Sequence, residues 1–151
     1  MRTIHGNPTS KYAPGWRLRV HRLCCHMSTP RIAGLAGFLA VSLGAFGAHA
    51  LKGQLLAAGT QELWHTAVSY HLAHAACLAA LCFAPHPLPP ALKVTRASWA
   101  LGILVFSGTL YAMALGAPRW LGAVTPVGGI CLLVGWAALA FARNPGKERS
   151  S

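Results

Sequence analysis

Residues 32–51 read IAGLAGFLAVSLGAFGAHAL, an uncharged and largely apolar run between Arg31 and Lys52. A helix needs about 20 such residues to cross a hydrocarbon core about 30 Å thick, in which an open backbone polar group finds no partner. Three further runs reach this length, at residues 63–83, 97–115 and 121–142. The four runs predict an all-α integral membrane protein with four spans.

The overall composition supports the same class of protein. Of the 151 residues, 54% are hydrophobic and only 10% are charged, which is too apolar for an ordinary soluble domain. The formal net charge of +11 raises the question of nucleic-acid binding. The basic residues, however, flank the apolar runs and do not share a face with aromatic residues. We therefore expect the lipid bilayer, and no nucleic acid, as a partner.

The distribution of lysine and arginine predicts the orientation of the spans, because basic connections stay on the cytoplasmic side of a membrane. If the four runs cross in turn, eleven basic residues share one side: Arg2, Lys11, Arg17, Arg19, Arg22, Arg31, Lys93, Arg96, Arg143, Lys147 and Arg149. Only Lys52 and Arg119 fall on the other side, where Trp64 and Trp120 would mark the interface with water. This pattern predicts an antiparallel four-helix bundle with short connections and both termini in the cytoplasm.

Residues 1–26 are basic, contain no acid and show no apolar periodicity, so we expect a disordered extension ahead of a membrane domain at 27–151. We favour Met27 as the translation start of a bacterial inner-membrane protein. If the extension is a presequence, the mitochondrial inner membrane is the alternative. The tripeptide Ala48-His49-Ala50 imitates a signal-peptidase site, but the preceding run is longer than a signal core, and cleavage would leave three spans.

Small residues predict where the helices approach one another, since close backbone contact drives much of helix association in lipid. We expect packing seams at Ala36, Ala40, Gly44 and Ala48 in the first run and at Gly108 and Ala112 in the third. These seams would face another helix of the chain or a second copy. A homo-oligomer or a membrane protein partner therefore stays open.

The fourth run contains an expected helix break in its first turns. Pro126 has no amide donor, and Gly128 and Gly129 loosen the backbone beside it. We expect a kink or a non-helical turn there. Such a break exposes backbone groups for an ion or substrate in transporters, or it is an ordinary packing kink.

Polar side chains inside the spans are the candidates for a functional site. At 1.5 Å per residue, His71, His74 and Ser107 lie near the midplane, Tyr70, Tyr111 and Thr125 in the outer half, and His49 near the outer surface. At about 100° per residue, His71 and His74 share a helix face with Trp64 and Ala67, whereas His65 points away.

Two interpretations of these histidines stay open. Each is either a functional group whose charge changes inside the membrane or a neutral imidazole hydrogen-bonded across a helix interface. The runs contain no Glu-x-x-His pattern, carboxylate partner or zinc-type cysteine spacing. We therefore expect no metal, no cofactor and no catalytic residue.

Four motifs resemble a known family. They are GAFGAHAL at 44–51, WHTAVSY at 64–70 with His74-Ala75, FSGTLY at 106–111, and TPVGG at 125–129 with Gly135-Trp136. In this order they resemble the signatures of the domain-of-unknown-function 423 family, which includes bacterial inner-membrane proteins and the eukaryotic transmembrane protein 256. The resemblance implies a four-span fold and no established activity. It directs attention to the polar members of the motifs: His49, Tyr70, His74, Ser107, Tyr111 and Thr125.

Three functional hypotheses follow. The first is a non-enzymatic membrane component for assembly or interaction, because the short connections leave no room for a catalytic domain. The alternative is a small oligomeric permease or proton-linked transporter that uses the intramembrane histidines and the break at Pro126. A haem or redox protein would need His49 paired with His74 or His71, and an absorption band in the visible range would test it.

Overall fold

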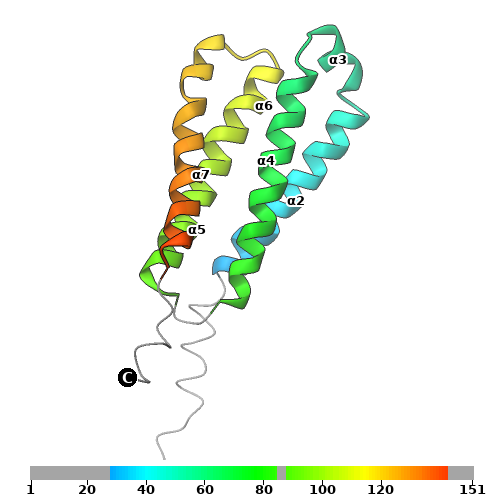
Figure 1. The fold of residues 1–151 in the computed structure, drawn as a ribbon. Helices are drawn as coiled ribbons and strands as arrows, with labels where there is room; N and C mark the ends of the chain where they lie inside the picture. Colours follow the sequence, from blue (N-terminus) through cyan, green and yellow to red (C-terminus); the bar gives the residue numbers. More distant parts are fainter. Residues whose placement is uncertain (1–27, 85–87, 143–151) are drawn as a thin grey trace, which may run out of the picture.

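The computed structural model describes residues 28–84 and 88–142, so the predicted extension at 1–26 lies outside the described residues. All regular secondary structure within these two ranges is helical (Figure 1). Its elements are α2 (Ser28–Ala48), α3 (Lys52–Ala57), α4 (Gln61–Ala80), the 3₁₀ turn η1 (Leu81–Phe83), α5 (Pro90–Gly102), the π-helical segment η2 (Ile103–Ser107), α6 (Gly108–Ala114), the 3₁₀ segment η3 (Arg119–Ala123) and α7 (Thr125–Ala140).

Four of the helical stretches are long and apolar enough to cross a membrane, which confirms the predicted number of spans. They cover Thr29–Ala48, Gln61–Phe83, Pro90–Ala114 and Arg119–Ala140. The third span begins seven residues before the predicted residue 97, because Pro90 occupies the first turn of α5, where no amide donor is needed. Lys93 and Arg96 therefore lie inside this helix and not ahead of it.

The four spans lie side by side along one direction (Figure 1). α3 and the connection from α6 to α7 lie at one end of the molecule, and the beginnings of α2 and α5 lie at the other. The most extensive helix contacts join α2 to α4 and α5 to α7, while α4 also contacts η2 and α6. α4 thus lies between α2 and the third span, and α2 packs chiefly against α4.

The buried side chains form two clusters, and α4 contributes to both. The first cluster consists of Ala33, Leu78, Leu81, Trp99, Ile103 and Leu132. The second consists of Leu55, Trp64 and Ala114. Leu55 is only 1% exposed, so the short helix α3 is packed onto the end of the bundle.

Trp64 does not mark an interface with water, contrary to the sequence-based expectation. It is 3% exposed, and its indole N–H donates to the carbonyl of Leu43 on α2 at 3.0 Å. Gly47 makes room for the indole ring, because a Cβ there would collide with Trp64. This tryptophan is therefore a packing residue between α4 and α2, while Trp120 is 66% exposed near the end that carries α3.

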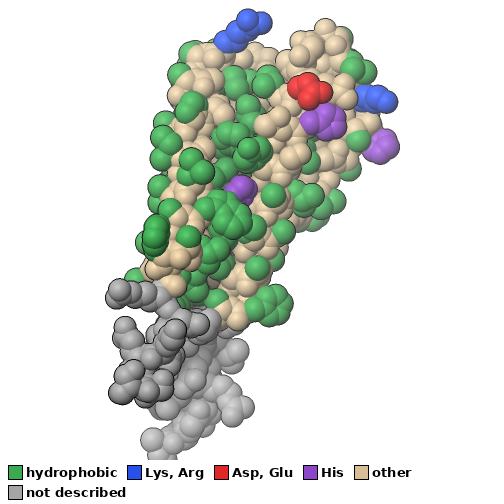
Figure 2. Space-filling model, in the orientation of Figure 1, with side chains coloured by type: hydrophobic (Ala, Val, Ile, Leu, Met, Phe, Trp, Pro, Cys, Tyr) green, Lys and Arg blue, Asp and Glu red, His purple; other side chains and the backbone are tan. Residues whose placement is uncertain are grey.

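The outer surface of the spans is apolar. On the face shown in Figure 2, hydrophobic side chains cover the long helices, and the charged side chains in view gather near the end where α3 lies. Large exposed side chains include Phe38 on α2, Leu104 in η2 and Leu133 on α7. A surface of this kind needs hydrocarbon around it, as the apolar runs predict.

Candidate functional site

One face of α4 carries two of the buried polar side chains of the molecule. Trp64, Ala67, His71 and His74 follow one another at helical spacing and are all buried, with the two histidines 6% and 7% exposed. His65 is exposed, as the helical periodicity predicts. The two buried rings face different neighbours.

His74 has a hydrogen-bond partner at each ring nitrogen. Its Nδ1 lies 2.8 Å from the carbonyl oxygen of Tyr70, one turn earlier, and its Nε2 lies 3.1 Å from the indole nitrogen of Trp136 on α7. An indole N–H can only donate and a carbonyl can only accept. Nε2 must therefore be the acceptor and Nδ1 must carry the hydrogen, which makes this ring a neutral imidazole that joins α4 to α7.

Aromatic rings surround His74. Trp99 and Trp136 pack edge to face with centroids 5.0 Å apart, and each lies 6.1 Å from the His74 ring. Tyr70 stacks on His74 at 6.1 Å and contacts Phe106 at 4.7 Å. The sequence analysis did not assign Trp99 or Trp136 to this site, although Trp136 belongs to the last family motif. No periodicity signal could have found them, because the site depends on which helix lies opposite α4.

His71 faces Tyr111 of α6. Its Nδ1 and the phenol oxygen are 3.5 Å apart, the upper limit for a hydrogen bond, and the two ring centroids are 6.2 Å apart. Tyr111 is in turn held by Trp64, whose ring meets it edge to face at 4.8 Å. Within residues 28–84 and 88–142, no group hydrogen-bonds to the second ring nitrogen of His71.

The six polar residues that the motifs indicated do not meet in one place. Tyr70 and His74 lie together, but Tyr111 pairs with His71. The Thr125 hydroxyl lies 2.9 Å from that of Thr109, where it links α7 to α6. His49 is exposed beyond the end of α2, because the helix stops at Ala48.

Ser107 is buried in η2, and in the described part of the chain its hydroxyl has no hydrogen-bond partner. The π-helical segment itself gave no signal in the sequence. Thr109 compensates for the irregular backbone, since its hydroxyl donates to the carbonyls of Val105 at 2.8 Å and Phe106 at 3.0 Å. Segments of this kind are frequent at functional sites and at helix irregularities.

The expected helix break takes the form of a junction between η3 and α7. Val124 separates the two segments, and Pro126 lies in the first turn of α7, where its missing amide donor costs no helical hydrogen bond. Gly128 has a packing role, because a Cβ at this position would collide with the backbone of Phe106. An added Cβ at Gly129 would only touch the Phe106 ring, at 3.8 Å.

The small residues proposed as seams have different environments. Ala40 is fully buried, and a Cβ at Gly44 would lie 3.4 Å from Val68 on α4. Ala48 is exposed, and Ala112 is half-buried. A Cβ at Gly108 would meet no atom within 4 Å. The closest approach on α2 is instead at Gly47, outside the series of four-residue intervals.

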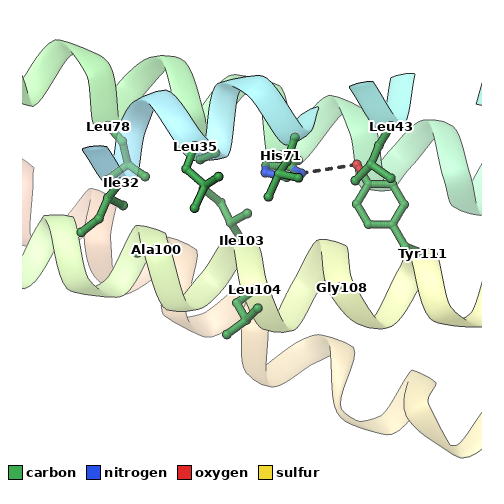
Figure 3. A pocket seen from close by; sticks show the side chains of 12 residues that line it. Ile32, Leu35, Leu43, His71, Leu78, Ala100, Ile103, Leu104, Gly108 and Tyr111 are labelled. Atoms are coloured by element: carbon green, nitrogen blue, oxygen red, sulfur yellow. Dashed lines mark hydrogen bonds between the residues drawn. The ribbon is translucent and has the colours of Figure 1, made fainter. Parts of the chain in front are cut away.

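A groove runs between α2 and the third span, with α4 as its floor (Figure 3). We call it the α2 groove. It has a volume of about 390 Å³ and is lined by Ile32, Leu35, Ala36, Leu39, Leu43, His71, Leu78, Ala100, Ile103, Leu104, Gly108 and Tyr111. His71 and Tyr111 are the polar side chains of this lining, and the other lining residues are apolar or glycine. Ala36 and Gly108, two of the predicted seam residues, thus line open space.

The described residues contain no group of three or more His, Cys, Asp or Glu that could hold a metal ion. The buried histidines also lack the geometry of a shared site, since His74 uses both ring nitrogens within the protein. The arrangement therefore provides an apolar groove with one polar pair, His71 and Tyr111, in its wall.

This chain is similar in sequence to membrane proteins of several bacteria. Residues 43–129 match the model of a family described as "Protein of unknown function (DUF423)". The UPF0382 membrane protein YwdK of Bacillus subtilis is 39% identical over 113 residues, which cover 74% of this chain and 91% of that protein. A UPF0382 membrane protein of Haemophilus influenzae is 36% identical over 110 residues, covering 73% and 88% of the two chains.

A eukaryotic relative is similar to the same degree. A UPF0382 membrane protein of Schizosaccharomyces pombe is 34% identical over 118 residues, which cover 75% of this chain and 98% of that protein. No solved structure matches this chain. The relatives' names place them in membranes and assign no activity.

Proposed function

Because the chain belongs to the DUF423 family of membrane proteins of unknown function, we propose that it is a non-enzymatic multi-pass membrane component that binds a lipid chain in the α2 groove. Membership of this family is what the four sequence motifs predicted. The observation that carries the functional proposal is the groove itself, which lies between α2 and the third span and has an almost entirely apolar lining.

The size of the groove favours a chain-like occupant. Its volume of about 390 Å³ falls within the range of roughly 300–1,000 Å³ that is typical of small-molecule sites. A helix is about 10–12 Å across with its side chains, so a helix would rest on the rim without filling the groove. From Ile32 to Leu43, α2 rises about 17 Å, which is roughly half of a hydrocarbon core about 30 Å thick. A single lipid chain within one leaflet has these proportions.

The hydrogen bonds of the buried polar side chains support a binding role and not a catalytic one. His74, one of the midplane histidines that motivated a proton-linked transporter, has both ring nitrogens engaged by Tyr70 and Trp136. The connections at residues 49–60 and 115–118 are short and hold one small helix, so they provide no separate catalytic domain. This arrangement favours a binding role over proton-linked transport.

The proposed orientation is an antiparallel four-helix bundle with both termini in the cytoplasm. Arg31, Lys93 and Arg96 lie toward one end of the spans, while Lys52 and Arg119 lie toward the other, and basic segments stay on the cytoplasmic side. We place the protein in a bacterial inner membrane. The mitochondrial inner membrane is the alternative, and a relative named as a membrane protein in fission yeast shows that the family also occurs in a eukaryote.

A groove-filling substitution tests the proposed function. Ala100 lines the groove, so Ala100→Phe should lower the amount of lipid that stays bound to the purified full-length protein in native mass spectrometry. Ala137→Phe makes the same change at an exposed position of α7 and should leave lipid retention unchanged. Equal retention by both variants, or cross-links that place a second copy in the groove, would contradict the proposal.

A further inference from the structure

The α2 groove is polar at one place in its wall. His71 and Tyr111 lie toward the end at Leu43, whereas the rest of the groove, toward Ile32 and Leu78, is lined by aliphatic side chains (Figure 3). His71 is 6% exposed, and its Nε2 has no hydrogen-bond partner among the described residues. The His71 side chain borders an apolar groove, where a polar atom without a partner costs free energy, so this nitrogen is expected to meet a ligand atom.

The pair presents a hydrogen-bond donor whichever way its own hydrogen bond runs. If the Tyr111 hydroxyl donates to Nδ1, then Nε2 carries the ring hydrogen and is free to donate. If Nδ1 donates to the phenol oxygen, the Tyr111 hydroxyl is free to donate and Nε2 can accept. A ligand carbonyl oxygen accepts the free hydrogen of the pair in either case. In the second case a ligand hydroxyl can also donate to Nε2 while it accepts from Tyr111.

The other residues that line the α2 groove determine whether the ligand is charged or neutral. The described part of the groove wall carries no charged side chain, so an ionic head group at this depth would lack a counter-ion. A phospholipid would place its terminal methyl groups against His71. The Nε2 atom of His71 would then have no hydrogen-bond partner. A second groove between α4 and α7, of about 350 Å³, contains His74, whose nitrogens are already engaged. The α2 groove is therefore the better receptor for a polar atom.

We infer that the α2 groove binds a neutral lipid with a carbonyl or hydroxyl oxygen at one end of an apolar chain, and that this oxygen hydrogen-bonds to His71 and Tyr111. This inference rests on the proposed function. The apolar chain lies along Leu35 and Ile103 toward Ile32 and Leu78, and the oxygen lies near the middle of the bilayer. Recognition requires no redox or covalent step.

Matched photoreactive probes test the inference on the full-length protein in lipid nanodiscs. Three probes carry the same diazirine-bearing hexadecyl chain and end in a hydroxyl group, in a benzoquinone ring or in a methyl group. We expect the two oxygen-bearing probes to label the groove about three- to tenfold more strongly than the alkane, because a net hydrogen bond is worth about one kcal/mol. The two oxygen-bearing probes separate alcohols from quinones as the natural class.

The variants separate recognition of the oxygen from binding of the chain. His71→Phe and Tyr111→Phe should remove the preference for oxygen while alkane labelling continues. His65→Phe makes the same change on an exposed face of α4 and should keep the preference. Tyr111→Phe removes a single hydroxyl group, so it still tests the inference if His71→Phe does not fold.

The results can refute oxygen recognition alone or the proposed lipid binding itself. Equal labelling by all three probes in the unmodified protein, or a preference that persists in Tyr111→Phe and His71→Phe, would refute oxygen recognition and leave the groove as a site for a plain chain. Labelling that is insensitive to Ala100→Phe and maps outside α2 and the third span would refute the proposed function itself.

Discussion

The indole N–H of Trp136 on α7 donates to Nε2 of His74 on α4, with 3.1 Å between the two nitrogens. α7 packs mainly against the third span, so this bond is a direct polar link between the second and fourth spans. It also determines the tautomer of His74, because the indole nitrogen cannot accept.

Loss of this link should destabilise the bundle measurably. Trp136→Phe keeps an aromatic ring and removes the donor, which leaves a buried acceptor on His74. We expect the free energy of unfolding to fall by about 1 kcal/mol, since hydrogen bonds between membrane helices average about 0.6 kcal/mol and reach about 1.7. Denaturation in mixed detergent micelles measures it, with Trp120→Phe at an exposed position as the control. A similar stability of both variants would contradict a role for the bond.

A second prediction concerns the contact between α7 and the π-helical segment. Gly128→Ala places a Cβ against the backbone of Phe106, which cannot rotate away, so the two spans must separate. We expect a loss of stability of about 1–3 kcal/mol, the usual range for overpacking.

Gly37→Ala is the matched control for that substitution. A Cβ at Gly37 meets no atom within 4 Å, and alanine is about 1 kcal/mol more favourable than glycine inside a helix. Thermal unfolding of the two variants in the same detergent should therefore move in opposite directions. If Gly128→Ala is as stable as Gly37→Ala, the close approach of α7 to Phe106 is wrong.

The sequence predicted the spans because the length of an apolar run is a local property. It also placed His71 and His74 on one face of α4, since helical periodicity needs no knowledge of neighbouring helices. It did not predict that Trp136 lies opposite His74 and Tyr111 opposite His71, because which helix lies opposite α4 is decided by tertiary packing. His49 does not lie with the other polar residues of the motifs, because α2 ends at Ala48.

The irregular backbone segments were the other feature that local sequence patterns could not predict. Pro126 correctly marked a change in helix geometry, but it begins α7 and does not break a helix at depth. The π-helical segment Ile103–Ser107 has an ordinary apolar sequence, and Gly128 of α7 packs directly against it. Such a segment is a property of the interface between two spans and not of either span alone.

The hydroxyl of Thr109 should contribute to the stability of this segment. It donates to the carbonyls of Val105 and Phe106 and lies 2.9 Å from the hydroxyl of Thr125. Thr109→Val keeps the shape and removes these bonds, so we expect a loss of about 1 kcal/mol. Thr66→Val, at an exposed position of α4, is the control. A double-mutant cycle with Thr125→Val should show coupling, and strict additivity would argue against the link between α6 and α7.

The proposed orientation predicts which ends of the spans are accessible from outside a bacterial cell. In a background without the five cysteines, Gln54→Cys on α3 should react with a membrane-impermeant maleimide added to intact cells, because Gln54 is exposed at the end proposed to lie outside. Lys93→Cys, exposed near the beginning of α5, should react only after the membrane is permeabilised. The physical reason is the excess of lysine and arginine at the end that carries Lys93, which resists translocation. Labelling of Lys93→Cys in intact cells, together with protection of Gln54→Cys, would reverse the orientation and place both termini outside.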